Sequence, residues 1–271
     1  IIIKEIIMSD LIVYKSNDLV SASYNLTLAE QRIILFAISK LNPASADNKT
    51  VVIKASEFAE QFKNIDKNSI YKAIKDGLDD LYNKSIILKD NSKKITFRWL
   101  QSKVYYDNEA TAELTFSDQI IPYLFDLKNK FTKYKLSNIS TFKSVYSIRL
   151  YELLAQYKVI KIRNIEVNEL REMLLLGDKY TRLFDLKKRV IEKAVNELNE
   201  KSDLSISYKI SDDVIAFSIK SKKLEDEELV VINSSSNKKE YKSRSTTKST
   251  KKPINIKKSS YYAGIKSGII V

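Results

Sequence analysis

The sequence contains no histidine and no cysteine. Zinc sites of the usual Cys/His type cannot form without these residues, and neither can disulfides or a nucleophile activated by histidine. A histidine pair that holds a metal beside a DNA-cleaving tyrosine is excluded for the same reason, so the 16 tyrosines do not indicate strand cleavage. We expect a protein without enzymatic activity and without a cofactor.

Glycine is also scarce, because the chain has only Gly77, Gly177, Gly264 and Gly268. None of them lies in a phosphate-binding pattern of the P-loop or dinucleotide type. Carboxylates are abundant, so a magnesium-dependent nuclease that uses Asp and Glu stays open as an alternative. Its clearest candidate is the acidic run at 225–228, but consecutive residues cannot all converge on one ion, and a solvated linker explains the run better.

Long apolar runs are missing as well. The longest, at 33–38, is far too short to span a bilayer. No secretory signal pattern is found at the start, so we expect a cytoplasmic protein without a membrane partner. The first methionine is Met8, and residues 1–7 are expected to be a non-native upstream segment. The total of 271 residues suits two ordinary domains.

The net charge of +13 is concentrated near the end of the chain. From residue 233 onward, ten Lys or Arg residues face a single Glu, which gives a net charge of +9 there and leaves +4 for the preceding residues. This segment is rich in Ser, Thr and Lys and too poor in apolar residues to form a core. We expect a disordered basic tail that adds salt-sensitive affinity for phosphates or, alternatively, only aids solubility.

Two stretches of the chain show the same order of elements. The first has a helix at 27–41 that opens with the capping box Thr27-Leu-Ala-Glu30, a strand at 50–54, and helices at 56–62 and 68–82. Strands at 85–89 and 94–106 should form a wing, followed by a strand at 112–116 and a helix capped at Ser117. The second has helices at 140–157, 168–176 and 183–199, with strands at 161–167, 204–210 and 214–220. The pattern predicts an α+β fold of two tandem winged-helix (helix-turn-helix) domains.

The helix at 183–199 is the best candidate for reading DNA. In a helix-turn-helix the second helix lies in the major groove, so it needs an apolar inner face and a basic, amide-rich outer face. The inner face is predicted to consist of Leu183, Leu186, Val190, Ile191, Ala194, Val195 and Leu198. The outer face contains Asp185 and Asn199 together with the predicted base-reading residues Lys188, Arg189, Glu192, Lys193 and Asn196.

Phosphate contacts are predicted at two places. Lys179, Arg182 and Lys187 lie around the start of that helix, and Lys94 and Arg98 lie on the first predicted wing. A solvated lysine-rich surface would look similar, and what favours the DNA-reading interpretation is the position of the helix before a hairpin. In the first half, the corresponding helix region has the acidic residues Asp66, Asp76, Asp79 and Asp80 against Lys67, Lys72 and Lys75. There we expect protein–protein or glancing backbone contacts.

Three segments of the chain resemble a known family. They read NDLVSASYNLTLAEQRIIL from Asn17, YSIRLYELLAQYK from Tyr146 and YTRLFDLKKRVIEKAVNELN from Tyr180. In residue sequence and spacing they resemble the Rep_3 family of theta-type plasmid replication initiators, over roughly residues 11–220. The resemblance implies an N-terminal winged helix at 8–135 for dimerisation and backbone contacts, and a C-terminal one at 136–222 for sequence-specific reading. Residues 223–271 would be an acidic linker and the basic tail.

The resemblance also implies partners. Monomers would bind iteron repeats in double-stranded origin DNA and promote origin opening, and dimers would repress their own promoter at an inverted repeat. The host replicative helicase and the host initiator would be recruited. A winged-helix transcriptional regulator without initiator activity and a module that docks proteins remain alternatives. The target sequence, the repeat spacing, the monomer–dimer balance and the host cannot be read from the chain.

Overall fold

The computed structural model describes residues 11–44, 48–62, 69–90, 93–125 and 130–222. The predicted upstream segment, the acidic run at 225–228 and the basic tail lie outside the described residues, as do Asp66 and Lys67 of the first half.

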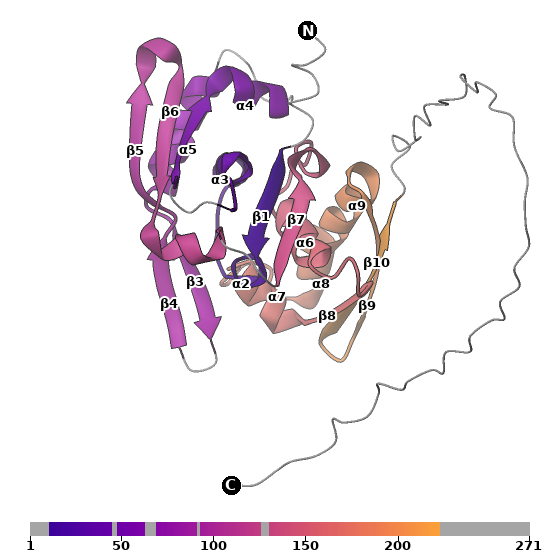
Figure 1. The fold of residues 1–271 in the computed structure, drawn as a ribbon. Helices are drawn as coiled ribbons and strands as arrows, with labels where there is room; N and C mark the ends of the chain where they lie inside the picture. The colour runs from indigo at the N-terminus through magenta and orange to yellow at the C-terminus, as the bar shows by residue number, and fades with distance from the viewer. Residues whose placement is uncertain (1–10, 45–47, 63–68, 91–92, 126–129, 223–271) are drawn as a thin grey trace, which may run out of the picture. The chain divides into compact units, whose positions relative to one another are not determined.

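The first half contains the predicted helix, strand, helix and helix in that order (Figure 1). These elements are α3 (Leu28–Lys40), β2 (Thr50–Lys54), α4 (Ala55–Gln61) and α5 (Ile70–Leu81). The capping box is confirmed at the start of α3: the Thr27 hydroxyl accepts the Glu30 amide at 3.3 Å, and the Glu30 carboxylate accepts the Thr27 amide at 2.7 Å. These bonds satisfy two amides that a helix start leaves free.

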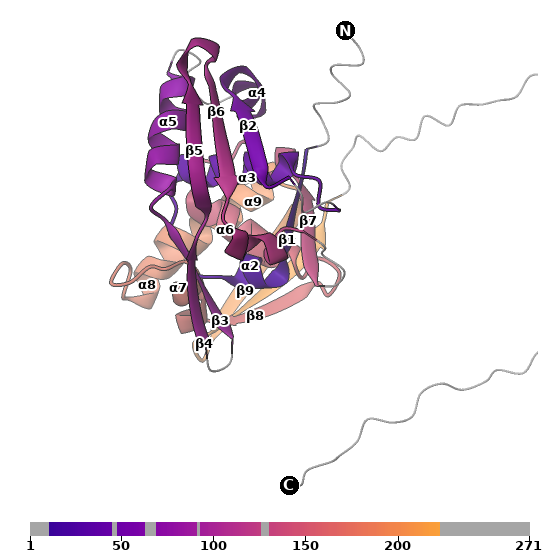
Figure 2. The ribbon, with the colours of Figure 1, turned by 60° about the vertical axis from the view of Figure 1, so that its left-hand side comes forward.

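The first wing differs from the prediction. A single strand at 94–106 is wrong, because the buried Trp99 separates β4 (Lys93–Arg98) from β5 (Leu100–Tyr106). β4 pairs with β3 (Ser85–Asp90), whereas β5 pairs with β6 (Thr111–Phe116) in a sheet of order β2-β6-β5. The wing of this winged helix is thus β5–β6, closed by the turn η1 (Asp107–Glu109), and β3–β4 is a separate hairpin pointing the opposite way (Figure 2).

Two predicted helix starts are also wrong. The residues after Ser117 form a 3-10 helix, η2 (Asp118–Tyr123), and the Ser117 hydroxyl donates to the Arg98 carbonyl at 2.6 Å instead of capping it. The helix predicted from residue 140 begins later, as α6 (Val145–Ala155), after the short η3 (Leu136–Asn138). It begins there because the Ser144 hydroxyl accepts the Tyr146 amide at 3.2 Å.

A two-stranded sheet was not predicted. β1 (Ile12–Ser16) pairs antiparallel with β7 (Phe131–Lys135), and β1 leads directly into the short helix α2 (Asn17–Ser21). Each strand has only five residues and finds its partner more than a hundred residues away, so no local pattern signals the pair.

The second half follows its predicted order. It contains β8 (Ile162–Glu166), α7 (Val167–Met173), β9 (Leu204–Ser211) and β10 (Val214–Ser221), with the sheet order β8-β10-β9. Asp212 and Asp213, with φ of 49° and 61°, form the two-residue turn of the β9–β10 wing. The predicted long helix is α8 (Leu183–Leu186), the π-helical turn η4 (Lys187–Ile191) and α9 (Glu192–Lys201) in succession. Together they are called the recognition helix below.

A buried charged cluster joins the β1–β7 sheet to α6. Lys15 and Glu152 are both fully buried, and their side chains form an ion pair at 2.8 Å. Glu152 also accepts the Tyr134 hydroxyl at 2.7 Å and the Arg149 guanidinium at 3.2 Å. Burial raises the pKa of Glu152, but Lys15 and Arg149 outweigh it and hold that pKa below its ordinary value.

Arg149 extends this cluster in both directions along the chain. Its guanidinium donates to the Ala22 carbonyl at 2.8 Å, next to α2, and to the Met173 carbonyl at 3.4 Å, at the end of α7. The described residues belong to one compact unit, and the bond from Arg149 to the Met173 carbonyl links this cluster to α7 of the second winged helix. In the part of the chain that the structure describes, every helix is too short or too polar to cross a membrane.

Candidate nucleic-acid interface

The turn before the recognition helix is held by Arg171 of α7. Its guanidinium donates to the carbonyls of Gly177 at 2.8 Å, Lys179 at 3.0 Å and Tyr180 at 2.6 Å. Gly177 and Tyr180 both have left-handed backbone conformations, with φ of 53° and 55°. Because one side chain satisfies three carbonyls of a turn with this unusual backbone, the start of the recognition helix is fixed relative to α7.

The inner face of the recognition helix is confirmed at six of its seven predicted positions. The buried residues are Leu186, Val190, Ile191, Ala194, Val195 and Leu198. Leu183 is the exception, because its side chain is 40% exposed. The prediction failed there because Leu183 is the first residue of the helix, and its side chain lines a cleft beside the wing instead of packing into the core.

The outer face carries the predicted base-reading residues. Lys188, Arg189, Lys193 and Asn196 are exposed, and Glu192 is half-buried. Among the described residues, no acidic side chain pairs with the ammonium groups of Lys188 and Lys193. The structure thus brings these side chains onto one solvent-facing surface, with two cations available for an anionic or hydrogen-bonding partner.

Asp185 organises the arginines of this surface. Its two carboxylate oxygens lie 2.7 Å from the Nε atom of Arg182 and 3.6 Å from the Nε atom of Arg189. Asp185 is largely covered whereas both arginines are mostly exposed, so the carboxylate orients the guanidinium groups and leaves their outer N–H donors free.

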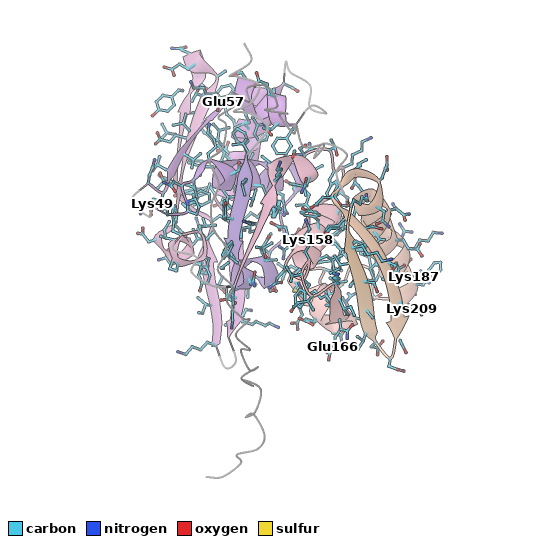
Figure 3. The ribbon with its side chains drawn as sticks, turned by 45° about the vertical axis from the view of Figure 1, so that its right-hand side comes forward. Lys49, Glu57, Lys158, Glu166, Lys187 and Lys209 are labelled. Atoms are coloured by element: carbon cyan, nitrogen blue, oxygen red, sulfur yellow. The ribbon has the colours of Figure 1, made fainter. Side chains whose placement is uncertain are left out.

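Glu192 connects the recognition helix to the wing. Its carboxylate lies 3.8 Å from the ammonium group of Lys187 and accepts a hydrogen bond from Tyr208 of β9. Partial burial raises the pKa of Tyr208, and the neighbouring Glu192 raises it further. Figure 3 shows Lys187 and Lys209 beside each other where the helix and the wing meet.

Asn199 does not belong to the reading face, although the sequence pattern placed it there. Its amide group donates to the Ile206 carbonyl at 2.8 Å and accepts the Ile206 amide at 2.6 Å. This pair of bonds uses the side chain to fasten the helix end to β9, so it is not available for adenine.

The predicted phosphate contacts lie in two places. Lys179, Arg182 and Lys187 are exposed around the start of the recognition helix. Lys94 and Arg98 are exposed on β4, where the Arg98 guanidinium lies 5.7 Å from the centre of the Tyr82 ring. The β3–β4 hairpin reaches the second winged helix, because Lys89, opposite Lys94 in the register, pairs with Glu172 of α7.

On the equivalent surface of the first winged helix, two lysines are paired with aspartates. On α5, Lys75 pairs with Asp107 of the wing at 2.9 Å, and Asp79 pairs with Lys103 of β5. Tyr105 donates to the same Asp79 carboxylate at 2.8 Å. The hydrogen bonds from Lys103 and Tyr105 lower the pKa of Asp79.

Sequence reasoning missed Arg171, Asp185 as an organiser of arginines, and the exposed Phe184. The i,i+3 and i,i+4 spacing of Asp185 relative to Arg182 and Arg189 was a usable signal. The residues that the structure describes contain no group of three or more carboxylates placed to hold a metal ion, which is the feature that the nuclease alternative requires.

Comparisons with known proteins decide the family. The model described as "Initiator Replication protein, WH1" matches residues 12–155, and that described as "Initiator Rep protein, WH2" matches residues 166–223. The chain belongs to the Rep_3 family. Members of this family are DNA-binding replication initiators and are not enzymes.

Individual relatives agree with this assignment. The chain is 31% identical to a replication initiation protein of Escherichia coli over 73% of its own length and 65% of that protein, so it spans just under two thirds of that relative. It is 27% identical to an uncharacterized 27.6 kDa protein of Escherichia coli, over 74% of the chain and 90% of the relative. The solved structure of the Pi initiator protein in complex with iteron DNA matches with a TM-score of 0.67 at 22% identity, covering 78% of this chain and 97% of that one. The fold of two winged helices is therefore confirmed.

Proposed function

We propose that this chain initiates plasmid replication by binding iteron repeats at the origin, and that the recognition helix of the second winged helix reads the repeat. The observation that carries the proposal is the exposed face of Lys188, Arg189, Lys193 and Asn196 on that helix, in a chain of the Rep_3 family. The complex of the Pi initiator with iteron DNA, a protein of the same fold, supports the kind of target.

Each outward side chain has a role that suits its chemistry. Lys188, Arg189 and Lys193 can donate to guanine, Asn196 can pair with adenine, and Glu192 can accept from cytosine. Because Asp185 already holds the Nε side of Arg189, the free edge of that guanidinium is oriented for a two-bond contact. Lys179, Arg182 and Lys187 are assigned to phosphates that flank the reading face, and Lys94 and Arg98 to phosphates near the β3–β4 hairpin.

The first winged helix is assigned a different part of the task. We assign residues 8–135 to dimerisation and backbone contacts and residues 136–222 to reading, with monomers opening the origin and dimers repressing the promoter at an inverted repeat. The ion pairs of Lys75 and Lys103 and the acidic residues Asp76 and Asp80 on α5 support this division, because carboxylates repel the phosphates that flank the major groove. The host initiator and the replicative helicase would then be recruited to the opened origin.

The experiment is a binding titration of the full chain on direct repeats from a candidate origin and on scrambled duplex of equal length. Arg189→Ala should weaken binding to the repeats by ~1–3 kcal/mol with little change on scrambled DNA. The matched control is Lys133→Ala, which removes an exposed cation from β7 and should leave selectivity unchanged. Equal weak binding to both duplexes would contradict the proposal.

A second measurement separates an initiator from a transcriptional regulator. A plasmid that carries the repeats and no other replication gene is introduced into cells that supply the chain. Maintenance of the plasmid with the wild-type chain, and its loss with Arg189→Ala, is the expected result. Selective binding without maintenance would identify a regulator.

A further inference from the structure

The recognition helix begins with two exposed apolar side chains. Phe184 is 66% exposed and Leu183 is 40% exposed, while the next apolar residue, Leu186, is fully buried. A large aromatic side chain is an unusual choice for a solvent-facing position on a helix whose other exposed residues are charged or amidic. Phe184 does not pack into the core, so we look for a binding partner outside the chain that its ring contacts.

These two residues form one wall of a cleft between the helix and the wing. The opposite wall is Tyr208 and Ile210 of β9, and Lys187, Lys209 and Glu192 complete the lining. Figure 3 shows Lys187 and Lys209 at this place. Apolar groups in the cleft are thus bordered by cations. A polyanion that also presents an apolar group would be matched by both features.

Phe184 is coupled to a residue of the reading face. The ammonium group of Lys188 lies 5.7 Å from the centre of the Phe184 ring, one helical turn away. Phe184 is also the second residue of the helix, and the first residues of a recognition helix are those that approach base edges in the major groove. With the recognition helix in the major groove, the ring would meet a base pair next to the one assigned to Lys188.

We propose that Phe184, supported by Leu183, recognises the C5 methyl group of a thymine. This inference rests on the proposed function, since it needs the recognition helix in the major groove. The thymine methyl is the one apolar group that the four bases present there, and it is read by apolar contact. The charged heads of lysine and arginine bind acceptor atoms rather than a methyl group, so the ring of Phe184 adds an apolar contact to the charged face.

The test removes the methyl group from the DNA and the ring from the protein. A duplex is first selected by the full chain from random-sequence DNA, and each thymine is then replaced singly by deoxyuridine, which lacks only the methyl. For the wild-type chain, replacement at one or two positions should weaken binding about fourfold, the change expected when one buried methyl is lost. Phe184→Ala should bind the thymine duplex at least about fourfold more weakly and should bind both duplexes equally.

Two control variants show whether the effect of Phe184→Ala is specific to the thymine methyl group. Lys193→Ala should weaken binding while the thymine-to-deoxyuridine ratio stays at its wild-type value, because it changes a neighbouring contact. Val159→Ala removes an apolar side chain that is 92% exposed outside the recognition helix and should change neither affinity nor ratio. Thermal unfolding of each variant should match the wild type, since all three side chains are exposed.

Three results would overturn the inference. In the first, the wild-type chain binds every deoxyuridine duplex as tightly as the thymine duplex. In the second, Phe184→Ala keeps the full wild-type ratio of thymine to deoxyuridine binding. In the third, Phe184→Ala binds the selected duplex as tightly as the wild type, which would assign the ring to a protein partner. A chain that selects no duplex at all would contradict the proposed function itself. Failure of the inference can therefore be told apart from failure of the proposed function, because it is observed on a duplex that the chain does select.

Discussion

The recognition helix and α5 occupy the same place in their winged helices but use charge in opposite ways. On α5 and its wing, Lys75 and Lys103 are paired with Asp107 and Asp79. On the recognition helix, Lys188 and Lys193 have no acidic partner among the described residues. Helix position alone therefore does not make a DNA-reading surface. What differs is that the recognition helix keeps two lysines without an acidic partner and leaves the outer N–H donors of Arg182 and Arg189 free.

The largest effect is expected at the buried charged cluster that joins the β1–β7 sheet to α6. Glu152→Gln should destabilise the chain by ~3–5 kcal/mol, because Lys15 would remain buried without its anion. Chemical denaturation measures this loss, and both winged helices should unfold in one transition. Glu166→Gln, an exposed residue on β8, is the control and should change stability by less than ~0.5 kcal/mol.

The same variant has a pH signature. The folded pKa of Glu152 lies below its ordinary value of 4.5, so its contribution to stability is present above that value and is lost as the pH falls through the folded pKa. The stability difference between wild type and Glu152→Gln should therefore shrink in acid. A difference that stays constant from neutral pH down to about 3 would show that Glu152 is not the ionised centre of the cluster.

The next effect compares the two helices directly. Arg189→Ala should cost ~1–3 kcal/mol on the selected duplex, whereas Lys75→Ala on α5 should cost less than ~0.5 kcal/mol. Lys75 already donates to Asp107, so it has little to offer DNA. A titration of both variants on one duplex measures the contrast, and equal losses would mean that α5 also binds the groove.

A smaller effect separates support from reading on the recognition helix itself. Asn199→Ala should lower stability by about 1–2 kcal/mol, because it removes both hydrogen bonds to the Ile206 backbone. The ratio of binding to selected and scrambled duplex should stay constant, whereas Asn196→Ala should reduce it. A reduced ratio for Asn199→Ala in a fully folded protein would place that amide on the DNA after all.

The smallest effect is expected when a cation beside α5 is freed from its acidic partner, as Lys188 and Lys193 are on the recognition helix. Asp79→Asn removes the carboxylate that Lys103 and Tyr105 share and leaves Lys103 without its partner. Affinity for scrambled DNA should rise by no more than about threefold at low salt, since one exposed charge is worth up to ~0.5 kcal/mol there. An unchanged affinity would show that the first winged helix does not approach the backbone near α5.

The order of the helices in the two winged helices and most of the outer face of the recognition helix were predictable because they depend on local periodicity and capping. What escaped prediction depends on distant partners. Nothing near Lys15 signals that it pairs with Glu152, and the break at Trp99 comes from burial rather than from a turn signal. Leu183 fits the apolar period but lies exposed at the start of the helix, and the position of Asn199 on the outer face gives no sign of its bonds to β9.

The most direct test of the account compares two triple variants of the full chain on the selected and the scrambled duplex over a range of salt concentrations. One carries Lys188→Ala, Arg189→Ala and Lys193→Ala on the recognition helix, and the other carries Lys72→Ala, Lys75→Ala and Lys103→Ala on α5 and its wing. The account predicts that the first loses its preference for the selected duplex and that the second keeps it at every salt concentration. Loss of preference in the second, or its retention in the first, would contradict the claim that the second winged helix reads the DNA.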